Sequence, residues 1–128
     1  MRLAIDVSSE ESVTMAAETL ASSFETEAKP LYGIINNAGI GSSSIGLEPT
    51  LQVNTWGIHR VYEAFVPLLE ASGRIVNVTS AAGPNFVEAA DDVTRTMLTD
   101  PDVQWDAVEE YMNRCISESK DSASTLSS

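Results

Sequence analysis

Cysteine, histidine and basic residues are scarce in this chain of 128 residues. One cysteine and one histidine are present, so the chain can form neither an intramolecular disulfide nor a metal site built from several His and Cys ligands. Seven basic residues stand against 19 acidic ones, and the net charge of −12 repels nucleic-acid phosphates and anionic membrane surfaces. We therefore expect no metal ion, no nucleic acid and a reducing, cytoplasmic compartment.

Long apolar runs are also lacking, since none approaches the roughly 20 residues that span a bilayer. We expect no membrane association. Hydrophobic residues nevertheless make up 43% of the chain, enough for the core of one domain of this length. Acidic residues concentrate late, with ten acids and only three bases in residues 88–121. Such a run is usually a solvated face, and a protein-binding surface is the alternative.

The first 35 residues read as a strand, a helix and a second strand. Residues 3–7 form a short apolar run, which predicts a strand that ends near Asp6. Ser8 and Glu11 have the spacing of a capping box, and apolar residues then recur at steps of three and four through Phe24. Residues 31–35 are apolar throughout, which indicates a strand buried on both faces.

A loop, a helix and a third strand follow. Residues 39–49, rich in glycine and serine, predict a flexible loop, and residues 51–71 carry one apolar stripe typical of a long helix. Residues 74–80 form another β-branched strand. Strands and helices in alternation predict the α/β class, a partial Rossmann fold of three parallel strands with covering helices.

The pattern changes after residue 83. Residues 91–98 and 105–116 predict two acidic helices, and residues 117–128, with six serines, predict a disordered tail. We therefore expect a partial NAD(P)-binding Rossmann domain over 1–83, a helical insertion over 84–116 and the tail over 117–128.

Distinctive residues follow each predicted strand: Asp6, the quartet Asn36–Gly39, and Thr79 with Ser80. In an open parallel sheet, ligands lie beyond these carboxyl ends. Each residue alone has a structural explanation, as a helix cap, a turn or a strand end. Together with Val-Asn-Thr-Trp-Gly at 53–57 and Arg-Ile-Val-Asn-Val-Thr-Ser at 74–80, they resemble the short-chain dehydrogenase/reductase family over about residues 3–83.

That resemblance implies a cofactor site. The carboxylate of Asp6 would accept a hydrogen bond from the adenine amino group, and Val7 and Val53 would pack beside the ring. The ribose and pyrophosphate side would be lined by three further residues, namely Asn37, Ala38 and Gly39. Asn36 would tie neighbouring strands together.

The resemblance also implies two catalytic roles. Ser80 would orient and polarise the oxygen of a small-molecule carbonyl or alcohol, and Asn54 would hold, through its helix, a water of the proton relay. The parent reaction is hydride transfer between the nicotinamide of NAD(P) and a carbonyl or secondary alcohol.

Two parts of the family pattern are missing from these residues. No glycine-rich pyrophosphate loop precedes residue 3, and no Tyr-x-x-x-Lys occurs, because Cys115 stands four residues after Tyr111. We interpret Tyr111 as structural. The alternative to an oxidoreductase is therefore a truncated, catalytically incompetent fragment that acts at most as a protein-interaction module.

The acidic helices resemble the insertion of the carbonyl reductase type, in which the tyrosine comes well after the serine. That type implies a monomeric parent and favours NADP, with NAD possible. A lineage-specific surface feature is the alternative for 84–116.

In the strand order of the family, two strands that are absent here lie between the strand of residues 3–7 and the strand of residues 31–35. We expect residues 3–7 and 31–35 either to pair directly or to leave a gap, with residues 34 and 76 on adjacent strands in both cases.

Overall fold

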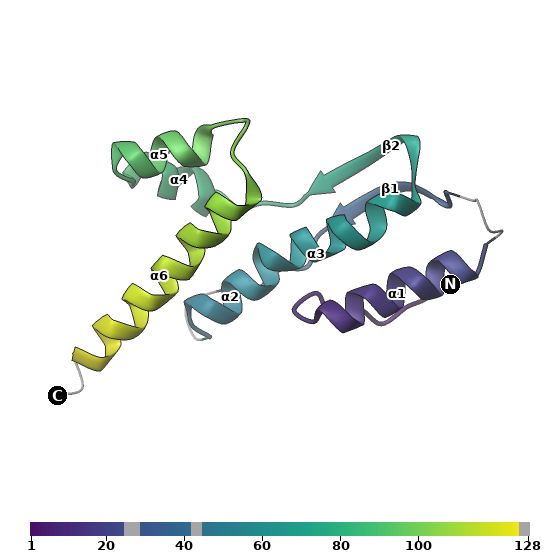
Figure 1. Ribbon diagram of the computed structural model, residues 1–128, viewed down its shortest axis with the longest axis horizontal. Coiled ribbons are helices and arrows are strands. Elements are labelled where there is room, and N and C mark those ends of the chain that lie inside the picture. The colour runs from purple at the N-terminus through teal and green to yellow at the C-terminus, as the bar shows by residue number, and fades with distance from the viewer. Residues whose placement is uncertain (25–28, 42–44, 126–128) are drawn as a thin grey trace. The chain divides into compact units, whose positions relative to one another are not determined.

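A computed structural model describes residues 1–24, 29–41 and 45–125, which form two compact units, Met1–Val78 and Thr79–Ser128 (Figure 1). The first unit contains, in chain order, α1 (Glu10–Ser22), β1 (Leu31–Asn36), α2 (Leu47–Asn54), α3 (Trp56–Phe65), the 3-10 turn η1 (Val66–Leu68) and β2 (Leu69–Asn77). The second contains α4 (Ala82–Ala89), α5 (Asp92–Thr99) and α6 (Trp105–Thr125).

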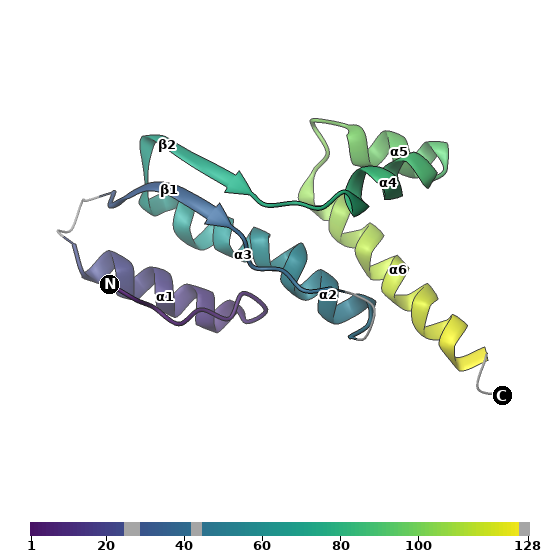
Figure 2. The same ribbon diagram turned by 180° about the vertical axis from the view of Figure 1, so that it is seen from behind.

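The sheet of the first unit confirms the α/β class. β1 and β2 run parallel, with Ile34 opposite Ile75 and Ile35 opposite Val76, as expected for adjacent strands. The two strands lie side by side with α3 behind them (Figure 2). Ile34 joins a core cluster with four residues from α1 and α3: Val13, Ala16, Ala17 and Phe65.

The predicted strand at residues 3–7 does not form, and the sheet has two strands where three were predicted. The backbone of this segment is used locally: the amide of Asp6 donates to the Ser12 hydroxyl at 2.9 Å, and its carbonyl accepts from the Ser9 amide at 3.1 Å. These bonds belong to the turn that begins α1. Direct pairing with residues 31–35 is therefore wrong.

Helix α1 begins one residue later than the capping box predicted. Ser9, not Ser8, is the N-cap, and its hydroxyl accepts from the Ser12 amide. The predicted stripe is confirmed where Val13, Ala16 and Ala17 are buried, whereas Phe24 is exposed. Ser8 instead donates hydrogen bonds to the carboxylate of Asp6, a residue of the candidate site.

The predicted single helix at 51–71 is divided and shifted. α2 begins at Leu47 inside the predicted loop, after Gly46, whose φ of 93° favours glycine. Pro49 lies in the first helical turn, where an amide hydrogen has no intrahelical partner to lose. α3 ends at Phe65 because Pro67 cannot donate to a continuing helix. Residues 42–44 of the predicted loop lie outside the described residues.

Strand β2 runs from Leu69 to Asn77 and not from residue 74 to 80. Burial was predicted for both faces of β1, and it is confirmed for one face only. Ile34 is buried against the helices, whereas Ile35 of β1 and its partner Val76 of β2 are 70% and 50% exposed. Within the described residues, helices cover only the Ile34 side of this sheet.

The second unit consists of helices. α5 and α6 occur near their predicted positions, and α4 was not predicted. Arg95 connects α5 to α4, since its guanidinium donates to the carbonyls of Val87, Glu88 and Ala90 at the end of α4. Disorder was predicted from residue 117, whereas α6 continues to Thr125; residues 126–128 lie outside the described part. None of the described helices is long and apolar enough to cross a membrane.

Candidate functional site

Three predicted cofactor residues meet at the carboxyl end of β1. Val7, Ala38 and Val53 come from three separate segments, and all line one small cavity of about 10 Å³. The other lining residues are Asn36, Gly57, Ile58 and Val61. This volume holds about one water. The cavity is therefore too small to enclose a ring the size of a purine.

Asp6 precedes Val7 and is solvent-exposed. Its Oδ1 accepts from the Ser8 hydroxyl at 2.6 Å and from the Ser8 amide at 2.9 Å. These two hydrogen bonds hold the pKa of Asp6 below its ordinary value, with a smaller contribution from the positive charge of Arg60. The side chain is thus a carboxylate at neutral pH, the form that accepts hydrogen bonds.

Asn54 fixes the loop that follows β1. Its Oδ1 accepts from the Ile40 amide and its Nδ2 donates to the Ile40 carbonyl, both at 2.9 Å. A Cβ on Gly39 would lie 3.5 Å from the same Oδ1. The side chain of Asn54 therefore positions the segment that contains Asn37, Ala38 and Gly39, and this segment is exposed on its other side.

The predicted link between neighbouring strands is confirmed for Asn36. Its Nδ2 donates to Oδ1 of Asn77 at 2.7 Å, and its carbonyl accepts from the Val78 amide at 2.9 Å. These contacts hold the ends of β1 and β2 together, directly before the Asn37–Gly39 segment.

Ser80 belongs to the second unit and is exposed. Its hydroxyl accepts from the Ala82 amide at 3.2 Å, and its carbonyl accepts from the Gly83 amide at 3.1 Å. The side chain lies at the turn that begins α4. The hydroxyl proton is left available for donation, since the hydroxyl acts as acceptor in this turn.

Tyr111 lies on α6 beside Cys115 and Arg114. Burial, followed by the neighbouring Cys115, raises its pKa, while hydrogen bonding to Thr94 and the charge of Arg114 act in the opposite direction. A tyrosine that exchanges protons near neutral pH requires a lowered pKa. The Arg114 guanidinium lies 5.3 Å from the Tyr111 ring centroid, a cation–π contact.

Two residues of this region were not predicted as functional, Gly57 and Arg60. Gly57 lies in the Val-Asn-Thr-Trp-Gly motif, and its position on a helix face next to Val7 could not be read from sequence. Arg60 carries no sequence signal beyond its charge. Its guanidinium donates to the Val7 carbonyl at 3.2 Å.

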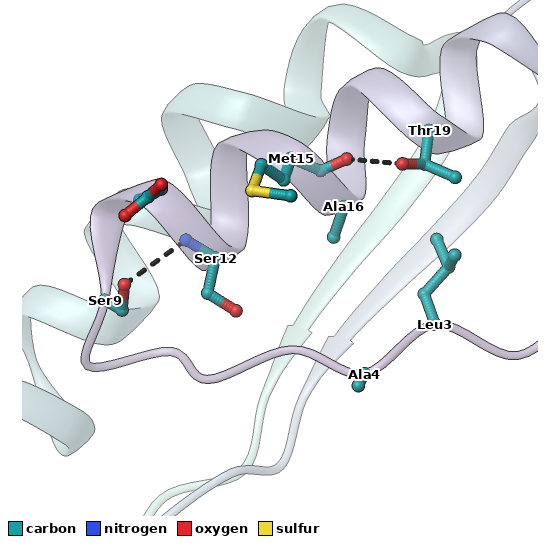
Figure 3. Close-up of a pocket in the computed structure, with 8 residues that line it drawn as sticks. Leu3, Ala4, Ser9, Ser12, Met15, Ala16 and Thr19 are labelled. Atoms are coloured by element: carbon teal, nitrogen blue, oxygen red, sulfur yellow. Dashed lines mark hydrogen bonds between the residues drawn. The ribbon is translucent and has the colours of Figure 1, made fainter.

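A larger groove of about 320 Å³ lies between the N-terminal segment and α1 (Figure 3). Leu3 and Ala4 form one wall, and Ser12, Met15 and Thr19 of α1 form much of the other. It contains none of the predicted cofactor residues. Among the described residues, no cluster of three or more His, Cys, Asp or Glu could hold a metal ion.

Two parallel strands with covering helices, and small and amide residues at the carboxyl end of β1, are consistent with a partial Rossmann fold. A family model described as short chain dehydrogenase matches residues 1–90. The chain belongs to the short-chain dehydrogenase family.

Curated relatives agree with this family. The mitochondrial D-beta-hydroxybutyrate dehydrogenase of Bos taurus is 40% identical over an alignment of 87 residues that covers 62% of this chain and 25% of the relative. The 3beta-hydroxysteroid dehydrogenase dhs-16 of Caenorhabditis elegans is 39% identical over 90 residues, 63% of this chain and 23% of the relative. Retinol dehydrogenase 5 of Homo sapiens is 35% identical over 89 residues, 62% of this chain and 27% of the relative. The chain spans about a quarter of the length of these relatives.

Proposed function

We propose that this chain forms the adenosine-binding side of an NAD(P)-dependent oxidoreductase that transfers hydride to or from a carbonyl or secondary alcohol. The observation that carries the proposal is the convergence of Val7, Ala38 and Val53 on one cavity, with an exposed carboxylate on Asp6, the residue before Val7. Family membership supports the reaction class.

The described residues fit an adenosine group. Asp6 would accept from the adenine amino group, and Val7 and Val53 would pack against the ring. Asn37, Ala38 and Gly39 would line the ribose and pyrophosphate side, held in place by the Asn54–Ile40 hydrogen bonds. The nicotinamide of the bound cofactor would supply the hydride.

The remaining two roles concern protons and the substrate oxygen. We propose that the Ser80 hydroxyl donates a hydrogen bond to that oxygen and stabilises the charge that develops on it. α2 ends at Asn54, and carbonyls at a helix C-terminus commonly bind water. That end of α2 would hold a water of the proton relay.

We propose NADP as the cofactor, with NAD as the alternative. We also propose that the parent enzyme is a monomer of the carbonyl reductase type. These proposals are supported by the resemblance of the acidic helices after residue 83 to the insertion of that type. A cytoplasmic location is likewise a proposal, supported by the single cysteine. The bovine relative is named as mitochondrial, so fractionation of cells that express the protein would distinguish the two compartments.

The second candidate is a catalytically incompetent fragment that acts at most as a protein-interaction module. It is favoured by the raised pKa of Tyr111 and by the cysteine, not lysine, four residues later. Under this candidate, the 128 residues do not catalyse the reaction and act at most through contact with another protein.

Two measurements on the chain test the proposal. Calorimetry should give a dissociation constant for NADPH near the millimolar range, about −4 kcal/mol, because only adenosine-side contacts are supplied. Carbonyl reduction should not exceed background, since a positioned proton donor alone contributes about 100- to 10,000-fold. No NADPH binding at millimolar concentration would contradict the cofactor site, and turnover by these residues alone would contradict the assignment of Tyr111 as structural.

A further inference from the structure

The segment that contains Asp6 and Val7 has no strand ladder to hold it in place. Its backbone hydrogen bonds within the described residues include those of the α1 turn and one long-range bridge, made by Arg60. Nη1 of Arg60 donates to the carbonyls of Val7 at 3.2 Å and of Gln52 at 3.0 Å. Nη2 donates to Oε1 of Gln52 at 2.6 Å. One guanidinium therefore connects the N-terminal segment to α2 and α3.

The break between α2 and α3 makes this bridge possible. α2 ends at Asn54, so the Gln52 carbonyl lies in its last turn, where carbonyls lack intrahelical partners. Arg60 supplies a partner from eight residues further on. The half-buried guanidinium thus donates to two oxygens of Gln52 in α2. The same Nη1 atom also donates to the Val7 carbonyl.

Gly57 allows the bridged segment to approach α3 closely. A Cβ at this position would lie 3.1 Å from Cγ2 of Val7 and 3.2 Å from its carbonyl oxygen, the same oxygen that Arg60 binds. Val7 is therefore held against the helix by a hydrogen bond at a place where a Cβ on residue 57 would require Val7 to shift by a few tenths of an ångström.

Resting on the proposed adenosine site, we infer that Arg60 is a positioning residue that sets selectivity for adenine. It fixes the carbonyl of Val7, which belongs to the same peptide as the Ser8 amide that donates to Asp6, and so it fixes the position of the Asp6 carboxylate. It does not itself touch the cofactor. Without it, Asp6 would keep its charge and its Ser8 contacts, but the Asp6–Ser8 turn would lose its anchor on α3, and the carboxylate would lose its fixed position relative to the purine edge.

The test compares two nucleotides by NMR titration of the ¹⁵N-labelled 128-residue chain. Adenosine monophosphate has the amino group that Asp6 would bind, and inosine monophosphate has a carbonyl oxygen in its place. Arg60→Met removes the bridge, and Arg60→Lys retains charge but cannot reproduce the planar fork. Arg74→Met is the matched control, because Arg74 is exposed and donates to carbonyls of neighbouring residues in its own strand.

The wild-type chain and the Arg74→Met variant should prefer adenosine monophosphate by about 2- to 10-fold, the value of one hydrogen bond. Arg60→Met and Arg60→Lys should reduce that ratio toward one while inosine monophosphate affinity stays within about 2-fold. A preference that survives in Arg60→Met would overturn the positioning role and leave the proposed function intact. No preference in the wild-type chain would overturn the adenosine site and this inference with it. Equal losses for both nucleotides would show that Arg60 only maintains the fold.

Discussion

Replacement of Gly57 by alanine tests how tightly Val7 is held against α3. Gly57 is buried, and the added Cβ would lie 3.1 to 3.2 Å from three atoms of Val7, one of them a backbone oxygen. Contacts this short require Val7 to move by a few tenths of an ångström. Arg60 and the α1 turn restrain that movement.

Two opposing effects set the size of the change. Alanine is preferred over glycine in a helix by up to about 1 kcal/mol, whereas overpacking of a close contact costs about 1–3 kcal/mol. We expect Gly57→Ala to lower the free energy of unfolding by about 1 kcal/mol. The double variant with Val7→Ala should recover part of the loss, with a coupling energy of about 0.5 kcal/mol or more.

Urea unfolding followed by circular dichroism provides the measurement, with the slope checked for constancy among variants. Gly83→Ala is the matched control, because Gly83 lies in α4 and an added Cβ there would meet nothing within 4 Å. That variant should be unchanged or more stable. A Gly57→Ala chain that is also more stable, or strict additivity with Val7→Ala, would refute the close packing of Val7 on α3.

Three further changes give distinct expectations. Asn54→Ala should lower the free energy of unfolding by about 1–2 kcal/mol through loss of two hydrogen bonds and should speed hydrogen exchange at the Ile40 amide, whereas unchanged exchange would contradict the loop restraint. Asp6 has a lowered pKa, so its stabilising contribution is present above the unfolded-state pKa and is lost as pH falls through the folded-state pKa; Asp6→Asn should flatten the acid side of a stability profile, and an unaltered profile would argue against the Ser8 contacts. Tyr111→Phe should leave cofactor affinity unchanged, and a large loss would contradict its structural role.

The sequence was most informative where a motif coincides with local backbone geometry. The Asn36 quartet follows an apolar run, and the structure places it at the end of β1, with Asn36 bonded to Asn77 as the resemblance implied. Apolar spacing likewise identified the buried face of α1. These features could be predicted because they are determined by residues close together in the chain and by one neighbouring strand.

The sequence was least informative where the outcome depends on distant partners. The apolar run at residues 3–7 has the composition of a strand, yet its backbone bonds with the α1 turn and with Arg60 in place of a neighbouring strand. The serine-rich segment after residue 117 has no apolar periodicity, but it extends a helix already begun at Trp105, and propagation of a helix is easier than its nucleation. The bridge by Arg60 could not be predicted, because it depends on where α2 ends.

The most direct test of the account is a map of amide chemical shifts as adenosine monophosphate is added to the wild-type chain. If this chain forms the adenosine side of a short-chain dehydrogenase site, the shifts should concentrate at Val7, Ala38 and Val53, which line one small cavity, and at the adjoining Asp6. Shifts centred on Met15 and Thr19 in the groove beside α1, or none at millimolar nucleotide, would contradict it.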